Sequence, residues 1–196
     1  MKRWARFAAI ALAAVFAGTL AGCASTYTLD NTVQSFSQIQ GLPSPATYRF
    51  ERLPSQQDAS QVQLEALADG ALNAVGLKRD DSHPHYAVQI NARTEATLSP
   101  WADPWDRFGL GFGGWGWRRR WGLGMSYNTE PPWYHREVNV IVRDLAANKV
   151  VYESRAISDG PYFDAAKVFP AMFQAALQGF PNPPAGPRVV NIQVAG

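Results

Sequence analysis

Alternation of apolar and polar residues predicts several strands along this chain. The alternating runs are Tyr27 to Leu29, 47–51, the run from Tyr86 onward, 138–143, 150–156 and 188–195. The runs on either side of the turn at 144–149 form the clearest hairpin, because Val138, Val140 and Val142 share one face. Residues 32–46 and 78–85 lack such alternation and are interpreted as loops.

Apolar residues three or four positions apart predict two helices. The first has Asp58 at an N-cap position, an apolar stripe from Leu64 to Val75, and Gly76 at its end. The second carries an apolar stripe over 169–180. It is expected to begin close to Pro170, because proline is tolerated in a first turn and disfavoured in a helix interior.

The grouping of strands around only two helices predicts an α+β fold. The expected architecture is a mostly antiparallel sheet with both helices packed on one face. The chain is long enough for one domain with a real core.

The first 25 residues have the pattern of a bacterial lipoprotein signal peptide. A basic start (MKRWAR) precedes an apolar run at 7–21, which is shorter than the roughly 20 residues of a spanning helix. The sequence LAGC, ending at Cys23, then resembles a lipobox, in which the cysteine takes a diacylglycerol and the chain is cut before it. An ordinary cleaved signal with a chance cysteine is the alternative. The two residues after Cys23 are Ala24 and Ser25, and neither is an aspartate. By resemblance to known sorting rules of Gram-negative bacteria, this favours the outer membrane over the inner membrane.

Loss of the signal peptide changes the charge of the protein. Three basic residues leave with it, so 15 remain against 16 acidic ones, and the near-neutral chain gives no reason to expect nucleic-acid binding. Cys23 is the only cysteine in the chain, so its acylation leaves no thiol for a disulfide.

The order of the motifs resembles that of a known family. The motifs are Asp30 and Phe36 ahead of Thr47-Tyr48, a helix ending at Gly76-Leu77, the hairpin VNVIVRDLAANKVVYES, and a helix ending at Phe180-Pro181. This order resembles the bacterial lipoprotein family called domain of unknown function 4136 over roughly residues 26–181. The family often has tryptophan and glycine where this chain has Tyr152 and Ser154, and residues 182–196 run past its pattern. The resemblance implies a lipoprotein fold without an established activity.

These observations predict three parts of the chain. Residues 1–22 form the signal peptide, 23–45 a lipidated tether with the first strand, and 46–196 a single periplasmic α+β domain. Within that domain, residues 98–136 are expected to form a loop rich in tryptophan and glycine, of a length that is unusual in compact domains.

The loop at 98–136 supplies the candidate contact surface. Its members are tryptophans and neighbouring arginines, namely Trp101, Trp105, Trp115, Trp117, Arg118, Arg119, Arg120, Trp121 and Trp133. Tryptophan and arginine favour a membrane surface or lipopolysaccharide. The same composition is typical of protein–protein hot spots, and flat tryptophans stack on sugar rings. In the alternative interpretation, the tryptophans fold back as a lid and form ordinary core.

The sequence predicts no catalytic site, no cofactor-binding site and no metal site. G-x-G-x-x-G occurs twice within 109–116, but neither a buried strand precedes it nor an apolar helix follows it. His83, His85 and His135 have no zinc-site spacing, and Asp103 and Asp106 are interpreted as turn residues. G-x-S-x-G and the phosphate-binding loop motif are missing from the sequence.

We therefore expect a lipoprotein on the periplasmic face of the bacterial outer membrane. Its predicted role is non-enzymatic, as a binding or cell-envelope maintenance module. The expected partners are the membrane, through the lipid on Cys23, and an envelope protein, glycan or lipopolysaccharide at the loop. The alternatives are a structural scaffold of an envelope assembly and a hydrolase acting on cell-wall or lipid substrates.

Overall fold

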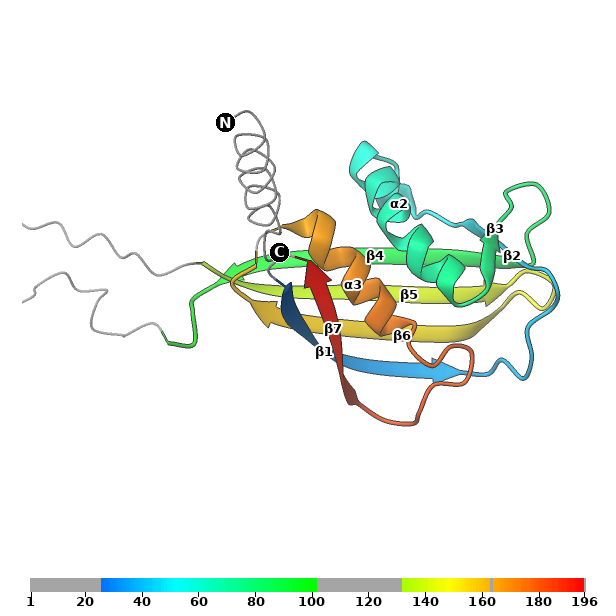
Figure 1. Cartoon of the computed structure of the whole chain (residues 1–196). Helices are drawn as coiled ribbons and strands as arrows, with labels where there is room; N and C mark the ends of the chain where they lie inside the picture. Colours follow the sequence, from blue (N-terminus) through cyan, green and yellow to red (C-terminus); the bar gives the residue numbers. More distant parts are fainter. Residues whose placement is uncertain (1–25, 102–131, 163, 196) are drawn as a thin grey trace, which may run out of the picture.

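The computed structural model describes residues 26–101, 132–162 and 164–195, and Figure 1 shows them as one sheet with two helices. The elements in chain order are β1 (Thr26–Ser37), β2 (Ala46–Phe50), the 3-10 helix η1 (Pro54–Gln56), α2 (Ala59–Ala74), β3 (Leu77–Arg79), β4 (Tyr86–Thr97), β5 (Trp133–Asp144), β6 (Lys149–Gly160), α3 (Ala165–Ala176) and β7 (Arg188–Ala195). The predicted signal peptide and Cys23 lie outside the described residues. Within the ranges above, no helix has the length and apolar character needed to cross a membrane.

The sheet is mixed but mostly antiparallel, as predicted. Its strand order is β3-β2-β4-β5-β6-β1-β7, and only the pairs β2–β3 and β2–β4 are parallel. The predicted hairpin is β5–β6, with Val138 opposite Ala156. The Asp144 carboxylate accepts the backbone N–H groups of Ala146 and Ala147 and so closes the turn between these strands.

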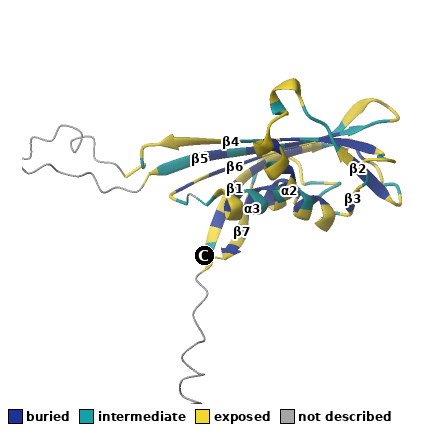
Figure 2. Ribbon diagram, turned by 90° about the horizontal axis from the view of Figure 1, so that it is seen from above, coloured by how far each residue is buried: buried dark blue, intermediate teal, exposed yellow. Residues whose placement is uncertain are grey.

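Both helices lie over the same face of the sheet (Figures 1 and 2). Helix α2 begins where the sequence predicts, because the Asp58 carboxylate accepts the N–H of Gln61. Its chain then reverses at Gly76, whose φ of 90° favours glycine. Leu72, which is fully buried, points from α2 into the core.

Helix α3 begins five residues earlier than predicted. The Asp164 carboxylate caps it by accepting the N–H of Ala166, so Pro170 stands inside the helix and not in its first turn. Proline removes the hydrogen bond to the carbonyl four residues before it. That carbonyl belongs to Ala166, which is exposed and can therefore bind water. The expectation that proline would mark the helix start is wrong for this reason.

Three segments interpreted as loops are partly strand, and one of them is the predicted loop at 98–136, because β5 begins at Trp133. Strand β1 continues to Ser37, and buried polar residues, Asn31 and Ser35, hide its alternation from a hydropathy pattern. A short strand, β3, begins at Leu77 and continues into the polar segment 78–85. The last predicted strand is confirmed as β7, which pairs with β1.

The hydrophobic core fills the space between the sheet and the two helices. Its buried members all lie between Leu29 and Val194. The Oη of Tyr152 and the Oγ of Ser154 both donate to the carbonyl of Ala176, at 3.0 and 2.6 Å, and satisfy the end of α3. The domain therefore has a complete core without the segment that carries Cys23.

Candidate contact surface

Strands β4 and β5 form an arm that extends beyond the helices. They pair continuously from Tyr86 opposite Asp144 to Thr97 opposite Trp133. The first part of β4 is mostly buried, whereas the part from Asn91 to Thr97 is exposed apart from half-buried Ala92. Figure 2 shows this exposed part projecting to one side of the helices. Residues 102–131, which lie outside the described residues, connect the two strands at this end of the arm.

The structure describes two of the nine predicted contact residues. Trp101 is 83% exposed, and its backbone N–H donates to the Ser99 hydroxyl at 3.2 Å. Trp133 is half-buried at the start of β5. The other seven predicted contact residues, Trp105, Trp115, Trp117, Arg118, Arg119, Arg120 and Trp121, lie outside the described residues, as does the lipidation candidate Cys23. Leu98, at 65% exposure, adds an apolar side chain beside the arm's tip.

The tip of the arm and the start of β1 lie at the same end of the sheet. Strand β5 begins where β6 ends, with Tyr134 opposite Gly160. Beyond β6, the ring of Tyr162 stacks on that of Tyr27 at a centroid distance of 4.0 Å and an interplanar angle of 18°. This stack joins the end of β6 to the start of β1. The segment preceding Thr26, which contains Cys23, therefore enters the domain at this end.

A buried arginine lies beneath this end of the domain. Arg136 is 1% exposed, and its guanidinium lies over the ring of Tyr134 at 4.7 Å from the centroid. Burial lowers its pKa because it removes water from the charged form, although the guanidinium stays charged at neutral pH. It forms no ion pair with a described residue, and its Nη1 has no hydrogen-bond partner among them. The sequence does contain a signal for this position, because Arg136 is in phase with Val138, Val140 and Val142 and therefore shares their buried face.

Arg136 belongs to a row of buried polar side chains on adjacent strands. Ser158 of β6 lies opposite Arg136, and Asn31 of β1 belongs to the next position of the same row. The Asn31 amide donates to the carbonyls of Leu29 and Val190, at 3.0 and 3.2 Å, which fixes its orientation. Its Oδ1 and the Oγ of Ser158 have no partners within the described chain. The row therefore has polar groups that the surrounding protein does not satisfy.

The opposite face of the arm carries charged side chains that pair with one another. Glu137 accepts from Arg155 at 2.5 Å and from Asn139 at 2.8 Å. Burial by itself would raise the pKa of Glu137, but these hydrogen bonds outweigh it and lower the pKa. His135 Nδ1 lies 2.7 Å from Asp159 Oδ1. Over the described part of the chain, no three His, Cys, Asp or Glu side chains are placed to hold a metal ion.

Comparison with known proteins gives weak structural similarities. A PDZ domain protein from Parabacteroides distasonis is 14% identical with a TM-score of 0.49, covering 94% of this chain and 42% of that one. A PelC dodecamer from Paraburkholderia phytofirmans is 11% identical with a TM-score of 0.48, covering 79% of this chain and 99% of that one. These values are too low to transfer a function or a mode of assembly. Among curated proteins, none matches the chain significantly.

The family model that matches this sequence covers most of the domain. It spans residues 32–182, from the middle of β1 to just past α3, and it stops before β7. This extent agrees with the motifs quoted from the sequence, which run from the first strand to Phe180-Pro181. The chain therefore belongs to the family described as Domain of unknown function (DUF4136).

Proposed function

We propose that this protein is an outer-membrane lipoprotein, anchored through Cys23, that acts without catalysis as a binding module of the periplasmic cell envelope. Its contact surface is the Trp/Arg segment at the tip of the β4–β5 arm, and the ligand is an anionic envelope surface. Tryptophan is suited to the membrane–water interface, and the arginines at 118–120 are suited to anionic head groups.

The observation that supports this proposal most is the shared end of the arm and the tether. The arm extends past the core with Trp101 83% exposed, and β1 begins at the same end. A chain held at Cys23, three positions before Thr26, is within about 11 Å of the start of β1. The arm tip is thus expected to face the membrane to which the lipid holds the domain.

Exposure of the arm favours contact over the lid interpretation. A lid over the core would need the segment to fold back along an arm whose own strand β4 is exposed from Asn91 onward, apart from Ala92. Trp101, the first predicted contact residue, points into solvent and not into the core. A structural scaffold remains the second candidate, because the paired charges around Glu137 and His135 also suit a static protein interface.

The anchor is tested by incorporation of radiolabelled palmitate. The native chain and a Cys23→Ala variant are labelled in a Gram-negative host, and the membranes are then fractionated. We expect label in the outer-membrane fraction for the native chain alone. Absence of label from both chains would contradict the anchor.

The contact surface is tested by replacing residues 98–132 with an Asn-Gly turn. Thr97 and Trp133 are directly opposite each other, so a two-residue turn can close the arm there. The mature chain with Cys23→Ser, with and without this replacement, is sedimented with phosphatidylglycerol vesicles and with phosphatidylcholine vesicles. We expect salt-sensitive binding to the anionic vesicles that the replacement abolishes while thermal stability is retained.

A large loss of thermal stability in the shortened chain would instead indicate a lid. Replacement of Arg118, Arg119 and Arg120 by alanine provides a matched variant of full length. It should weaken binding to anionic vesicles in proportion to the lost charge, by about 1 kcal/mol for each arginine near the surface. Equal binding of the native and alanine forms would exclude head-group contact through these residues.

A further inference from the structure

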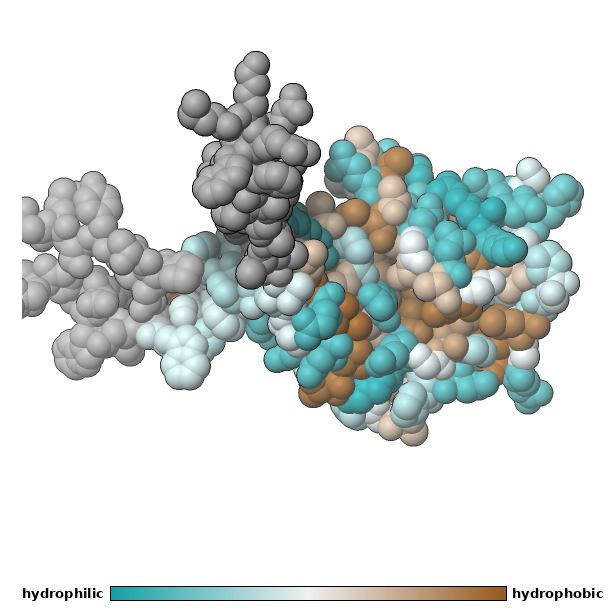
Figure 3. Space-filling model, in the orientation of Figure 1, coloured by the Kyte–Doolittle hydropathy of each residue, from teal (hydrophilic) through white to brown (hydrophobic). Residues whose placement is uncertain are grey.

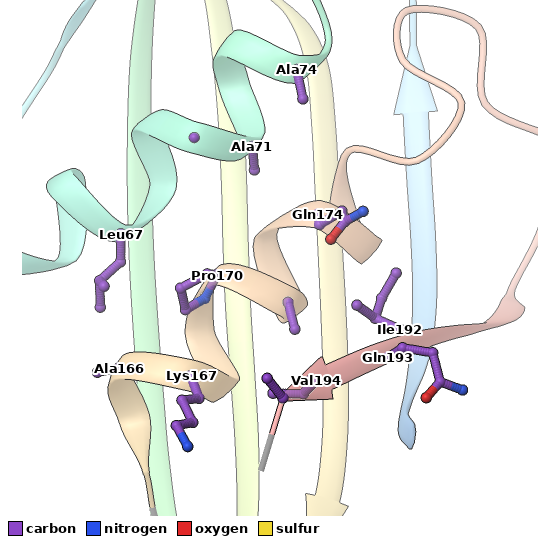
Figure 4. Close-up of a pocket in the computed structure, with 13 residues that line it drawn as sticks. Leu67, Ala71, Ala74, Ala166, Lys167, Pro170, Gln174, Ile192, Gln193 and Val194 are labelled. Atoms are coloured by element: carbon purple, nitrogen blue, oxygen red, sulfur yellow. The ribbon is translucent and has the colours of Figure 1, made fainter. Parts of the chain in front are cut away.

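A shallow apolar groove lies on the helix-bearing side of the domain. Helix α3 forms its floor, and α2 and β7 form its walls (Figure 4). It has a volume of about 500 Å³, within the range of ligand sites. The lining residues are mostly small, namely Gly70, Ala71, Ala74, Ala166, Pro170 and Ala171. Apolar residues also come to the surface beside β7 in Figure 3.

The groove runs along the free edge of a strand. Four consecutive residues of β7, from Ile192 to Ala195, line it. Successive side chains of a strand point to opposite faces, so a cavity that touches four consecutive residues also reaches the backbone of the strand. Strand β7 is the last in the sheet order and pairs with β1 on its other side. Within the described part of the chain no strand pairs with the other edge of β7, so half of its backbone N–H and C=O groups have no strand partner there.

This edge lacks the features that usually protect an edge strand. The other edge, β3, is three residues long, and two of these are Lys78 and Arg79. Strand β7 spans eight residues, and after Arg188 it contains no charge and no proline. Short length, charges and prolines are among the devices that hinder strand addition. Two of these devices, short length and charge, are present at β3, and among the described residues none of the three is present along β7 after Arg188.

Three polar side chains, those of Lys167, Gln174 and Gln193, lie on the rim of the groove. Lys167 lies exposed at the end where β7 finishes, beside Val194 in Figure 4, and makes no ion pair with a described residue. Gln174 and Gln193 border the middle of the groove. A ligand that fits therefore combines an extended backbone, small apolar groups and a negative charge near Lys167.

We propose that this groove binds an extended peptide segment of a partner protein, which adds to β7 as a further antiparallel strand. Alternate apolar side chains of the peptide fill the groove over α3, and an acidic residue at its N-terminal end pairs with Lys167. This is a second binding site, separate from the arm. Its β7 wall lies beyond residues 32–182, the part of the chain that the family model covers.

The free edge favours a peptide over the other occupants that an apolar groove could take. An acyl chain would exclude water from the outward N–H and C=O groups of β7 and leave them without partners. A second copy paired through its own β7 in antiparallel would point the two β1 starts in opposite directions, because Thr26 lies opposite Ala195. That arrangement does not suit two chains anchored in one membrane.

The test measures binding of a defined peptide to the mature chain with Cys23→Ser. The core lies within Leu29 to Val194, so this chain keeps its fold without the lipid. The probe is the peptide EVTVTVTS with fluorescein at its C-terminus, and binding is followed by fluorescence anisotropy. We expect saturable binding, together with slowed hydrogen exchange at alternate amides from Ile192 to Ala195. The peptide ETTTVVVS has the same composition without the alternation and should not bind.

Matched variants locate the site. Ala74→Trp places bulk in the groove, whereas Ala66→Trp places it on an exposed part of the same helix outside the groove. Ala74→Trp should abolish binding, and Ala66→Trp should not change it. Gln174→Trp gives the same block from α3 if Ala74→Trp destabilises the helix. Lys167→Glu should weaken binding of EVTVTVTS about threefold, as expected for an exposed ion pair.

Four results would overturn the proposal. The first is absence of saturable binding by EVTVTVTS. The second is equal weakening by Ala74→Trp and Ala66→Trp. The third is a dimer in sedimentation that Ala74→Trp abolishes, because it would make a second copy the occupant. The fourth is saturable binding of palmitate, blocked by Ala74→Trp, without protection of the β7 amides, because it would make an acyl chain the occupant.

Discussion

Replacement of Arg136 by methionine is expected to stabilise the domain. Arg136 is 1% exposed, has no ion-pair partner in the described chain, and leaves Nη1 without a hydrogen bond there. An unsatisfied buried polar group costs about 1–3 kcal/mol, and more when it is charged. The contact with the Tyr134 ring returns about 0.5–2 kcal/mol. Methionine retains the unbranched stem and removes the charge, so a net gain of about 1–2 kcal/mol follows.

The assay is urea unfolding of the mature Cys23→Ser chain at neutral pH. The gain should appear as a higher midpoint with an unchanged dependence on denaturant, because the surface exposed on unfolding is nearly the same. Arg143→Met is the matched control: Arg143 is on the same strand but is 27% exposed and paired with Glu51 and Asn148. Its replacement should be neutral or destabilising. A loss of more than about 1 kcal/mol for Arg136→Met would refute the reasoning and show that the guanidinium depends on a partner.

Three further predictions concern the fold. Burial raises the pKa of Tyr152, so the stabilising contribution of this residue is present below the ordinary tyrosine pKa near 10 and is lost as the pH rises above that value. Absorbance at 295 nm should show Tyr152 ionising together with alkaline unfolding. The Tyr152→Phe variant should show a smaller loss of stability at alkaline pH. Asp58→Ala removes the cap of α2 and should lower the free energy of unfolding by about 1 kcal/mol in the urea assay. Leu72→Ala leaves a cavity beneath α2 and should lower the free energy of unfolding by about 2–5 kcal/mol. The control is Val62→Ala on the same helix, where the side chain is 51% exposed. This change should lower the free energy of unfolding by less than a quarter as much in the same titration.

Local patterns predicted most of the elements because those elements depend on local chemistry. The hairpin β5–β6 follows from Val138, Val140 and Val142, and α2 follows from Asp58 and its apolar stripe. The pattern failed where buried residues were polar, as in the second half of β1. It also failed at α3, where a cap outside the helix, Asp164, determined the start in spite of the proline.

The sites depended on contacts that no local pattern contains. The groove joins α3 and β7 to α2, which ends at Ala74, far from the start of α3 at Ala165, and each element contributes residues that look unremarkable by themselves. The buried row of Asn31, Arg136 and Ser158 arises only from the register of three strands. By contrast, the sequence did indicate Trp101 as a candidate contact residue, because tryptophan beside a glycine-rich segment is unusual in itself, and its exposure is consistent with that role.

The position of β1 in the sheet has a mechanical consequence for an anchored protein. Strand β1 is an interior strand, paired with β7 over Thr26 to Val33 and with β6 over Thr32 to Ser37. A pull on the proposed Cys23 tether would act along this strand from its first residue. The load would be applied in shear, first to the hydrogen bonds with β7 and from Thr32 onward also to those with β6, and not by peeling an edge strand one bond at a time. This pairing of β1 therefore suits a domain that is under tension from the proposed anchor.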